Sequence, residues 1–525
     1  MKRSSLKWGI GFFALSSILV GCASEPDEAA GTEEKESEGG DLNISVVSDA
    51  QNLDPHNSND VPSWNVSFNI YETLLKHDEN MDLQPNLATD WEQVEDNLWE
   101  FQLEEGVTFH DGSEFNAEVV KVNFDRLLDE EVASPNAFLF DSIAEVNAVD
   151  DHTVEIVTEY PYAALPAHLA HMGSSMISKE LIEEDYAYAE DGNQFGAIIN
   201  QHPIGTGYFE FKEWNRGEKV TLTKNDHYWG EPAQVDRVTF TVSSEDLTRV
   251  GELESGSSHI TSVSPSDVNR VNNNENAEVH ERDSVSIAYL GFNTQKAPFD
   301  DKRVRQAISK AVNKQDVLNG IMEGHGVEAA GPLAEAIFGH NPDAAGLKYD
   351  PEKAKELLAE AGYEDGFDVT LWTNDSRERE DIAVLVQAQL EDINVNVSLE
   401  QFEWGAYLDR TAGGEHDMFI LGLSAATADA DYPLSMLYHS NNIGAAGNRT
   451  QFNNEDVDRL IEEARREGDE EQRLSLYHEA TDILIEEAPM LYLYHQEYLT
   501  GVSDQIEGFD LYSNGIYQLQ NVTIN

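Results

Sequence analysis

Apolar and polar residues alternate in several short segments of the chain, which is the pattern of a half-buried β-strand. Residues 42–47 and 98–103 show this alternation, and the apolar positions of 107–109 follow the second segment. The Asp111-Gly112 pair then marks a turn. We therefore predict strands at 42–47 and 98–103, the latter close to a tight turn.

A helical pattern, with an apolar residue every three or four positions, dominates the second half of the chain. Asp350 and Pro351 stand where an N-cap and a first helical residue are expected, and Gly362 stands where the helix should end. Similar helices are predicted after Asn116, after Asp301 and at 457–464. Strands and helices that alternate in this way predict α/β domains, with sheets covered by helices.

The charge balance argues against several classes of partner. The 525 residues include 100 acidic and 33 basic side chains, which gives a formal net charge of −67. Nucleic-acid and anionic-lipid binding depend on clustered Lys and Arg, so we expect neither. The chain is 40% hydrophobic and 9% aromatic, which argues against disorder. Its length predicts about two to four domains, and the acid excess suggests a salt-rich or alkaline medium.

The first residues carry the pattern of an export signal. Lys2, Arg3 and Lys7 precede an apolar run at 8–20 that is too short to favour a membrane span. The run ends in Leu-Val-Gly-Cys at 19–22, which resembles the lipobox of bacterial lipoproteins. That resemblance implies a signal peptide over 1–21 and a lipid on Cys22. The alternative is an ordinary signal peptide with a chance cysteine.

The segment after Cys22 predicts a tether. Residues 24–41 hold eight acidic side chains and one basic side chain, Lys35, so the chain repels itself and has nothing to pack. Cys22 is also the only cysteine of the protein, so no intramolecular disulfide can form. We expect residues 22–41 to hold a globular body away from a membrane surface.

Several motifs, taken in order, resemble the family 5 extracellular solute-binding proteins of ABC importers. The family includes oligopeptide-, dipeptide-, glutathione- and nickel-binding members. The matching motifs extend over nearly the whole chain after the tether: Leu53-Asp54-Pro55, 71–74, 84–91, 106–112, Gly205-Thr206-Gly207-Tyr208, 225–229, 289–318 and 350–363.

This resemblance implies an α/β fold of the periplasmic-binding-protein type (class II, cluster C), with two lobes, a hinge, a ligand cleft and an inserted third domain. Closure about the hinge would trap the ligand. The implied division of the body has three parts: a first lobe of 42–68, 205–290 and 500–525, an inserted domain of 69–204, and a second lobe of 291–499.

The resemblance also implies a function. The protein would be a monomeric, lipid-anchored receptor on the outer side of the cell membrane. It would capture short peptides, of di-, oligopeptide or glutathione-like type, and deliver them to membrane permease subunits served by cytoplasmic ATPases. Two alternatives stay open: a family receptor for a nickel chelate, an oligosaccharide or haem, and a lipid-tethered hydrolase.

The stretch 421–433 departs from the pattern of the family's peptide binders. Those proteins often place Gly-Trp here, followed by an aspartate that clamps the peptide amino group through a charge-assisted hydrogen bond. This chain has Leu423 and Ala426 at those positions and keeps only Asp429 and Asp431 nearby. It is closer to the glutathione-binding branch in this respect. Asp429 is either the amine ligand or the cap of the next helix.

Other ligand candidates lie on both sides of the implied cleft. Trp404 would stack on apolar ligand groups or belong to the core. Arg449, which follows Asn448 in a Gly-rich loop, offers a planar fork to a ligand carboxylate or pairs with surface acids. The resemblance places Arg377 and Arg379 near the ligand's carboxyl end, and it places Val61 in a segment whose backbone pairs with extended peptides.

Motifs for catalysis and for metal binding are lacking. The sequence has neither a P-loop nor a Gly-x-Ser-x-Gly elbow. His168 and His171 share helical spacing without a His-Glu-x-x-His motif, and the Asp78-x-Asn80-x-Asp82 segment lacks the glycine and the glutamate of a calcium loop. We therefore expect no catalytic residue, no cofactor and no resident metal.

Overall fold

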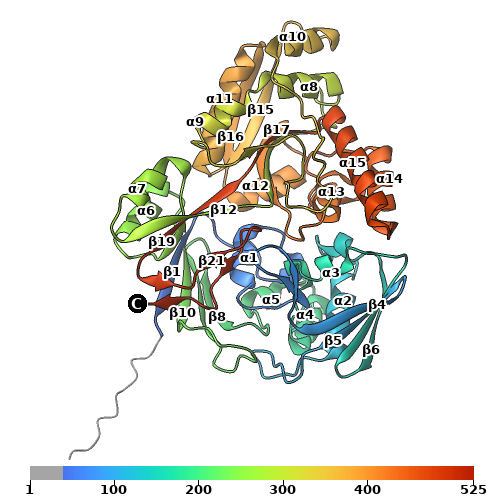
Figure 1. Ribbon diagram of the computed structural model, residues 1–525, viewed down its shortest axis with the longest axis vertical. Coiled ribbons are helices and arrows are strands. Elements are labelled where there is room, and N and C mark those ends of the chain that lie inside the picture. Colours follow the sequence, from blue (N-terminus) through green and yellow to red (C-terminus); the bar gives the residue numbers. More distant parts are fainter. Residues whose placement is uncertain (1–38) are drawn as a thin grey trace, which may run out of the picture. The chain divides into compact units, whose positions relative to one another are not determined.

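The computed structural model describes residues 39–525, which form one compact unit of three main sheets and the helices around them (Figure 1). The predicted signal peptide at 1–21, the predicted lipid-attachment residue Cys22 and most of the predicted tether lie outside the described residues. The first strand, β1 (Asp41–Val46), begins where the tether was expected to end. No helix within 39–525 is both long and apolar enough to cross a membrane.

The first lobe is built on a seven-stranded sheet in the order β12-β19-β11-β1-β10-β9-β8. Its central strand, β1, pairs in parallel with both β10 and β11. The other strands and the helices of this lobe are β8 (Phe209–Asn215), β9 (Lys219–Lys224), β10 (Arg237–Val242), β11 (Ile260–Ser262), β12 (Ala277–Asp283), β19 (Glu497–Ser503), α1 (Val61–Ser67), α6 (Asp246–Glu254) and α7 (Val268–Asn272).

The second lobe is built on a six-stranded sheet in the order β14-β18-β13-β17-β15-β16. Its strands are β13 (Ser286–Phe292), β14 (Val327–Glu328), β15 (Phe367–Asn374), β16 (Val395–Phe402), β17 (Met418–Ser424) and β18 (Met490–His495). Its helices are α8 (Lys302–Ala311), α9 (Lys314–Gly320), α10 (Pro351–Glu360), α11 (Arg377–Glu391), α12 (Trp404–Ala412), α13 (Asp431–Tyr438), α14 (Glu455–Arg466) and α15 (Glu470–Glu487).

The inserted domain carries an antiparallel sheet in the order β4-β5-β7-β6. Its elements are β2 (Leu75–His77), β3 (Leu83–Pro85), β4 (Ala88–Glu95), β5 (Leu98–Leu103), β6 (Ile143–Asp150), β7 (Thr153–Thr158), α2 (Ala117–Leu127), α3 (Leu165–His168), α4 (Lys179–Glu190) and α5 (Ala197–Gln201). Four two-residue strands close the chain: β20 (Ile506–Glu507), β21 (Asp510–Leu511), β22 (Tyr517–Gln518) and β23 (Thr523–Ile524).

The capping residues identified in the sequence act as caps in the structure. The Asn116 side chain accepts a hydrogen bond from Val119 N at 3.2 Å, and Asp350 accepts one from Lys353 N at 2.9 Å. Asp301 caps α8 in the same way, through Arg303 N at 2.9 Å. Each bond satisfies a backbone N–H that a helix leaves free at its start. The predicted strands correspond to β1 and β5, and the predicted helices to α2, α8, α10 and α14.

The chain crosses between the two large sheets at two adjacent points. Strand β12 pairs with β19 as far as Asp283 and Glu497, and β13 pairs with β17 from Ser286 onward. The crossings therefore lie near Ser284 and Gln496, where Ser284 N donates to Gln496 O at 3.3 Å. The boundaries expected at 290/291 and 499/500 fall inside β13 and β19, because β13 already begins at Ser286, ahead of the motif at 289–318, and β19 is continuous from Glu497 to Ser503.

The geometry of a second junction explains the Gly205-Thr206-Gly207 motif. Here the chain returns from the inserted domain and passes close to the segment by which it entered, with Gly207 N donating to Ile70 O at 2.9 Å. A Cβ atom on Gly205 would lie 2.2 Å from Ile70 O, and one on Gly207 would lie 2.6 Å from Asn69 O. Only glycine allows the two backbone segments to approach this closely.

A buried ion network fastens the inserted domain to the first lobe. Arg126 on α2 lies 2.6 Å from Asp54 of the Leu-Asp-Pro motif and 3.3 Å from Asp185 on α4, and none of the three side chains is exposed. Burial by itself would raise the pKa of the Asp54 carboxyl, but the Arg126 guanidinium outweighs burial and holds that pKa below its ordinary value.

Replacing Arg126 should therefore destabilise the protein strongly. Arg126→Met leaves two buried carboxylates without a counter-charge, so we expect the free energy of unfolding to fall by about 3–5 kcal/mol in urea titrations. The control is Arg237→Met. The Arg237–Asp41 pair at 2.8 Å is about half exposed, so its loss should cost at most about 1 kcal/mol. Equal small losses for both variants would contradict this role for Arg126.

Candidate functional site

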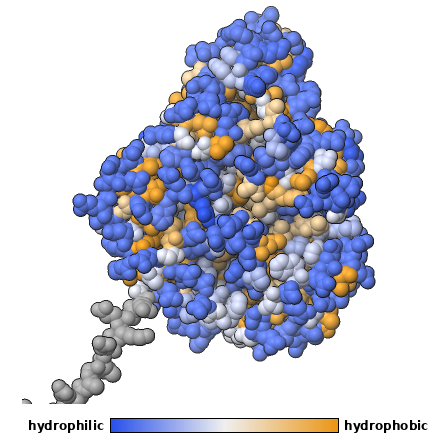
Figure 2. Space-filling model, viewed as in Figure 1, coloured by the Kyte–Doolittle hydropathy of each residue, from blue (hydrophilic) through white to orange (hydrophobic). Residues whose placement is uncertain are grey.

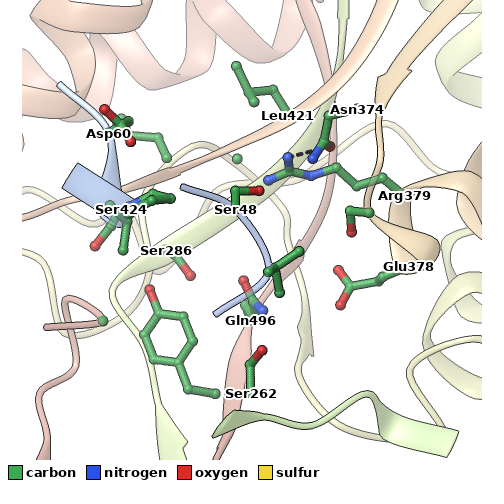
Figure 3. Close-up of a pocket in the computed structure, with 18 of the residues that line it drawn as sticks. Ser48, Asp60, Ser262, Ser286, Asn374, Glu378, Arg379, Leu421, Ser424 and Gln496 are labelled. Atoms are coloured by element: carbon green, nitrogen blue, oxygen red, sulfur yellow. Dashed lines mark hydrogen bonds between the residues drawn. The ribbon is translucent and has the colours of Figure 1, made fainter. Parts of the chain in front are cut away.

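A cavity of about 390 Å³ lies between the two lobes, and we call it the cleft cavity (Figure 3). Side chains from both large sheets line it, together with the crossing segment at 496–500 and the C-terminal residues Leu511, Gly515 and Tyr517. Apolar groups from the second lobe, including Leu421, Leu423, Met436 and Leu437, form part of its wall. A cavity of this size and lining suits a small organic ligand.

Five of the residues expected at the ligand site line the cleft cavity: Val61, Arg377, Arg379, Trp404 and Arg449. Asn448, Asp429 and Asp431 do not. The structure thus brings together residues that are as many as 388 positions apart in the chain, between Val61 and Arg449.

Arg449 is a buried cation without a counter-ion among the residues that the structure describes. Its side chain is 5% exposed, and its Nε has no hydrogen-bond partner in the described chain. Burial lowers the pKa of the Arg449 guanidinium below its ordinary value, and nearby tyrosines and acids only partly offset this effect. None of the ion pairs formed within 39–525 includes Arg449. Its guanidinium is therefore available to an anionic group in the cavity.

Asn448 supports Arg449 from outside the cavity. Its side-chain amide donates to Phe452 O at 2.8 Å and to His439 O at 3.2 Å. Its Oδ1 accepts from Thr450 Oγ1 at 3.0 Å and from Phe452 N at 3.1 Å. These four bonds satisfy the side chain completely, so Asn448 fixes the loop that presents Arg449 rather than facing a ligand itself.

A second arginine enters from the N-terminal turn of α11. Arg379 Nη1 donates to Asn374 Oδ1 at 2.8 Å, the bond drawn in Figure 3, and its guanidinium lies 5.6 Å from the centre of the Trp404 ring. The asparagine is neutral, so the charge of Arg379 stays uncompensated by this contact. Arg377 is exposed and lies 3.7 Å from Asp381 on the same helix.

Asp60 lies on the first-lobe side of the cavity, where it caps helix α1. Its carboxylate accepts from Ser63 N at 3.1 Å and from Ser63 Oγ at 2.7 Å. Trp404 Nε1, from the second lobe, approaches the same carboxylate at 3.5 Å. Asp60 is 6% exposed, and burial raises the pKa of its carboxyl above the ordinary value. No ligand role was predicted for Asp60, because an acid before Val-Pro indicates only a helix cap.

Val61 borders the cavity as the first residue of α1. In the segment that was predicted to pair its backbone with an extended peptide, Asp60 has extended backbone, at φ −135° and ψ 145°. The helix begins at Val61 because the Asp60 side chain satisfies Ser63 N and because proline at position 62 favours a first helical turn.

Asp429 and Asp431 are both held in internal ion pairs, which explains their absence from the cavity wall. Asp429 lies 2.7 Å from Arg473 on α15. Asp431, with no exposed side-chain surface, lies 2.8 Å from Arg465 on α14 and accepts from Tyr162 Oη at 2.9 Å. Burial by itself would raise the pKa of the Asp431 carboxyl, but the Arg465 guanidinium outweighs burial and holds that pKa below its ordinary value. Both carboxylates are thus engaged without a ligand.

One group of side chains within 39–525 has the composition of a metal site. Donor atoms of Glu281, His325 and Glu497 lie within 4.8 Å of one another near the crossing segment. His325 Nδ1 and Glu497 Oε2 are 2.9 Å apart and form an ion pair when the histidine is protonated. Their proximity is accounted for by this direct contact.

Comparisons with known proteins agree with the geometry. The family model described as "Bacterial extracellular solute-binding proteins, family 5 Middle" matches residues 82–445. The chain is 30% identical to a dipeptide-binding protein of Escherichia coli, covering 89% of this chain and 90% of that protein. It is 31% identical to a glutathione-binding protein of Salmonella typhimurium, covering 89% and 91%.

A solved structure is similar over almost its whole length. It is an ABC transporter-associated periplasmic binding protein of Helicobacter pylori in complex with the peptide STSA. The TM-score is 0.85 at 30% sequence identity, and the match covers 93% of this chain and 98% of that one.

The ion pair at Asp429 can be tested separately from ligand binding. Asp429→Leu leaves Arg473 buried without a counter-charge, so we expect the free energy of unfolding to fall by about 3 kcal/mol, while the double variant Asp429→Leu/Arg473→Met should recover most of that loss. Urea titrations of the four proteins in this cycle give the coupling energy. A single variant as stable as the wild type would show that Asp429 is not committed to Arg473 and is free to face a ligand.

Proposed function

Because the chain belongs to the bacterial extracellular solute-binding proteins of family 5, we propose that it is the ligand-capturing receptor of an ABC importer and that its ligand is a short peptide. The observation that carries the choice of ligand is Arg449, a buried guanidinium that lines the cleft cavity and has no carboxylate partner among the described residues. A peptide supplies the missing charge through its terminal carboxylate.

The charge of Arg449 has a cost in the unliganded protein, since a buried cation without a partner loses its hydration. A ligand carboxylate restores two charge-assisted hydrogen bonds to the planar guanidinium. Arg379 adds a second positive charge in the same cavity. The ligand is therefore selected by an anionic group, and glutathione-like peptides meet this requirement as well.

The rest of the cavity favours a compact ligand over a long one. Its volume of about 390 Å³ is near the lower end of the usual range for small-molecule sites. Trp404 and the leucines of the wall offer apolar surface to ligand side chains. These properties support a peptide of a few residues, held mainly by its termini, with apolar contacts to its side chains.

The two chain crossings near Ser284 and Gln496 support a cycle of capture and release. Within residues 39–525 the chain passes between the lobes at these two short segments, so hinge closure can enclose the ligand and opening can release it to a permease. We expect binding without turnover, since a receptor of this kind returns its ligand chemically unchanged.

We further propose that the receptor works outside the cytoplasm, held to the membrane by a lipid on Cys22. The lipobox-like sequence before Cys22 and the acidic segment after it support this proposal. Two or three acyl chains on one residue give stable anchoring. The acidic segment gives the receptor the reach it needs to meet both free ligand and permease.

Arg449 should be required for peptide binding but not for folding. We expect calorimetric titrations with di- to tetrapeptides to give saturable binding, and Arg449→Met to weaken it about 10- to 100-fold, the range set by a charge-assisted bond of about 1.5–3 kcal/mol. Unfolding should be unaffected or shifted to higher denaturant, because the variant removes an unpaired buried charge.

The matched control for this experiment is Arg459→Met. Arg459 is half exposed on α14, pairs with Glu463 at 3.0 Å and does not line the cavity. Its loss should leave affinity within about twofold of wild type. Release of amino acids from the titrated peptide, or unchanged affinity in Arg449→Met, would contradict the proposed function.

Anchoring is tested in cells that express the full-length chain. Wild-type protein should incorporate labelled fatty acid and enter the detergent phase on Triton X-114 extraction, and Cys22→Ala should do neither, because it removes the only thiol. Ser24→Ala, two residues away, is the control and should be labelled like the wild type. Labelling of Cys22→Ala would exclude lipid attachment at this residue.

A further inference from the structure

Asp60 is a buried acid at the cleft cavity that contacts no basic side chain among the described residues. The other deeply buried acids described above each contact an arginine: Asp54 pairs with Arg126, Asp429 with Arg473 and Asp431 with Arg465. Within the described part of the chain, Asp60 accepts hydrogen bonds only from the neutral donors Ser63 N, Ser63 Oγ and Trp404 Nε1. It forms no ion pair within residues 39–525, although it lines the cleft cavity.

Two of these three donors hold the carboxylate firmly in place. The Ser63 bonds are local to helix α1 and fix the orientation of both oxygens. The third donor, Trp404 Nε1, is long at 3.5 Å and comes from the opposite lobe. An ionised carboxylate has about four acceptor positions, so a strong donor can still be added on the cavity side. The burial that raises the pKa of Asp60 also strengthens its attraction to a cation.

Asp60 and Arg449 face the same cavity from different lobes. Asp60 belongs to the first lobe and Arg449 to the second, and each shifts the pKa of the other through space without forming an ion pair. Two buried opposite charges that do not touch are complementary to a molecule carrying both charges at a distance. In Figure 3 Asp60 lies at the upper left and Arg379, the other free cation of the described wall, at the right.

We propose that Asp60 binds the free ammonium group of the ligand, so that the cleft cavity selects zwitterionic peptides whose two termini are held by opposite lobes. The assignment rests on the proposed function, in which Arg449 takes the carboxylate. Trp404, whose Nε1 lies 3.5 Å from the Asp60 carboxylate, borders the same position with the edge of its ring. A ligand that joins Asp60 to Arg449 draws the lobes together, whereas a ligand with one blocked terminus engages only one of them.

A second acid of the cavity provides the comparison. Glu378, on α11, also lines the wall and forms no ion pair among the described residues. It differs from Asp60 in two respects: it is only half buried, and Tyr494 Oη donates to it at 2.5 Å. Asp60 is the better ammonium site for two reasons. It is more deeply buried, and its donor on the cavity side, Trp404 Nε1 at 3.5 Å, is held less tightly than the Tyr494 hydroxyl on Glu378.

The test measures the affinity of peptides with free or chemically blocked termini for the wild type and for variants of the cavity acids. The probe is the tightest-binding peptide from a panel of di- to tetrapeptides of alanine and leucine, together with its N-acetyl and C-amide derivatives. For wild type we expect each blocking group to weaken binding at least tenfold. Asp60→Asn keeps a good helix cap and should weaken binding of the free peptide at least tenfold, with no further loss on N-acetylation. Binding to Asp60→Asn should still weaken when the peptide is C-amidated. Binding to Arg449→Met should weaken on N-acetylation but show no further loss on C-amidation.

Two further variants control for folding and for the alternative acid. Asp350→Asn changes the cap of α10, whose carboxylate bonds Lys353 N away from the cavity, and should bind like wild type. Glu378→Gln should keep the full penalty for N-acetylation. Loss of that penalty in Glu378→Gln, or its persistence in Asp60→Asn, would overturn the assignment of Asp60 while leaving peptide binding intact. Absence of saturable binding of every free peptide to wild type would instead overturn the proposed function.

Discussion

The buried carboxylate of Asp431 holds the inserted domain against the second lobe, and the shape of the cleft depends on it. Arg465 Nε approaches it at 2.8 Å from the second lobe, while Tyr162 Oη, at 2.9 Å, and His168, at 3.5 Å, approach from the insert. Asp431 is also the first residue of α13, whose Met436 and Leu437 line the cleft cavity. The ion-paired Asp431 carboxylate thus sets the position of the apolar side chains that α13 contributes to the cleft cavity.

The interior uses charge in two distinct ways. Where acid and arginine meet directly, as at Asp54 and Arg126, they fasten one part of the fold to another and leave nothing for a ligand. At the cleft cavity the same residue types are kept apart, and the fold carries the cost of Asp60 and Arg449 as unpaired charges. Most of the 100 acidic residues serve neither purpose. On the face shown in Figure 2 hydrophilic side chains cover most of the surface.

Local chemistry could be predicted from the sequence, while long-range pairing could not. The caps Asn116, Asp301 and Asp350 work within three residues of themselves, so their helices were predictable. Asp429 and Asp431 looked like ligand residues because their partners, Arg473 and Arg465, lie 44 and 34 residues further along the chain. The family resemblance located Arg449 in the right region. Asp60 was missed because its cap role hides its exposure to the cavity, which only the packing of both lobes creates.

The position of β1 has a mechanical consequence. The chain enters the described body directly at this strand, which is the central one of the first lobe and is hydrogen-bonded in parallel on both sides. A pulling force on the preceding residues would therefore act on the hydrogen bonds that join β1 to β10 and to β11. Neither strand pair includes the chain crossings near Ser284 and Gln496. In an anchored molecule the first lobe would therefore take up such a force, and the second lobe would be the one that moves on closure.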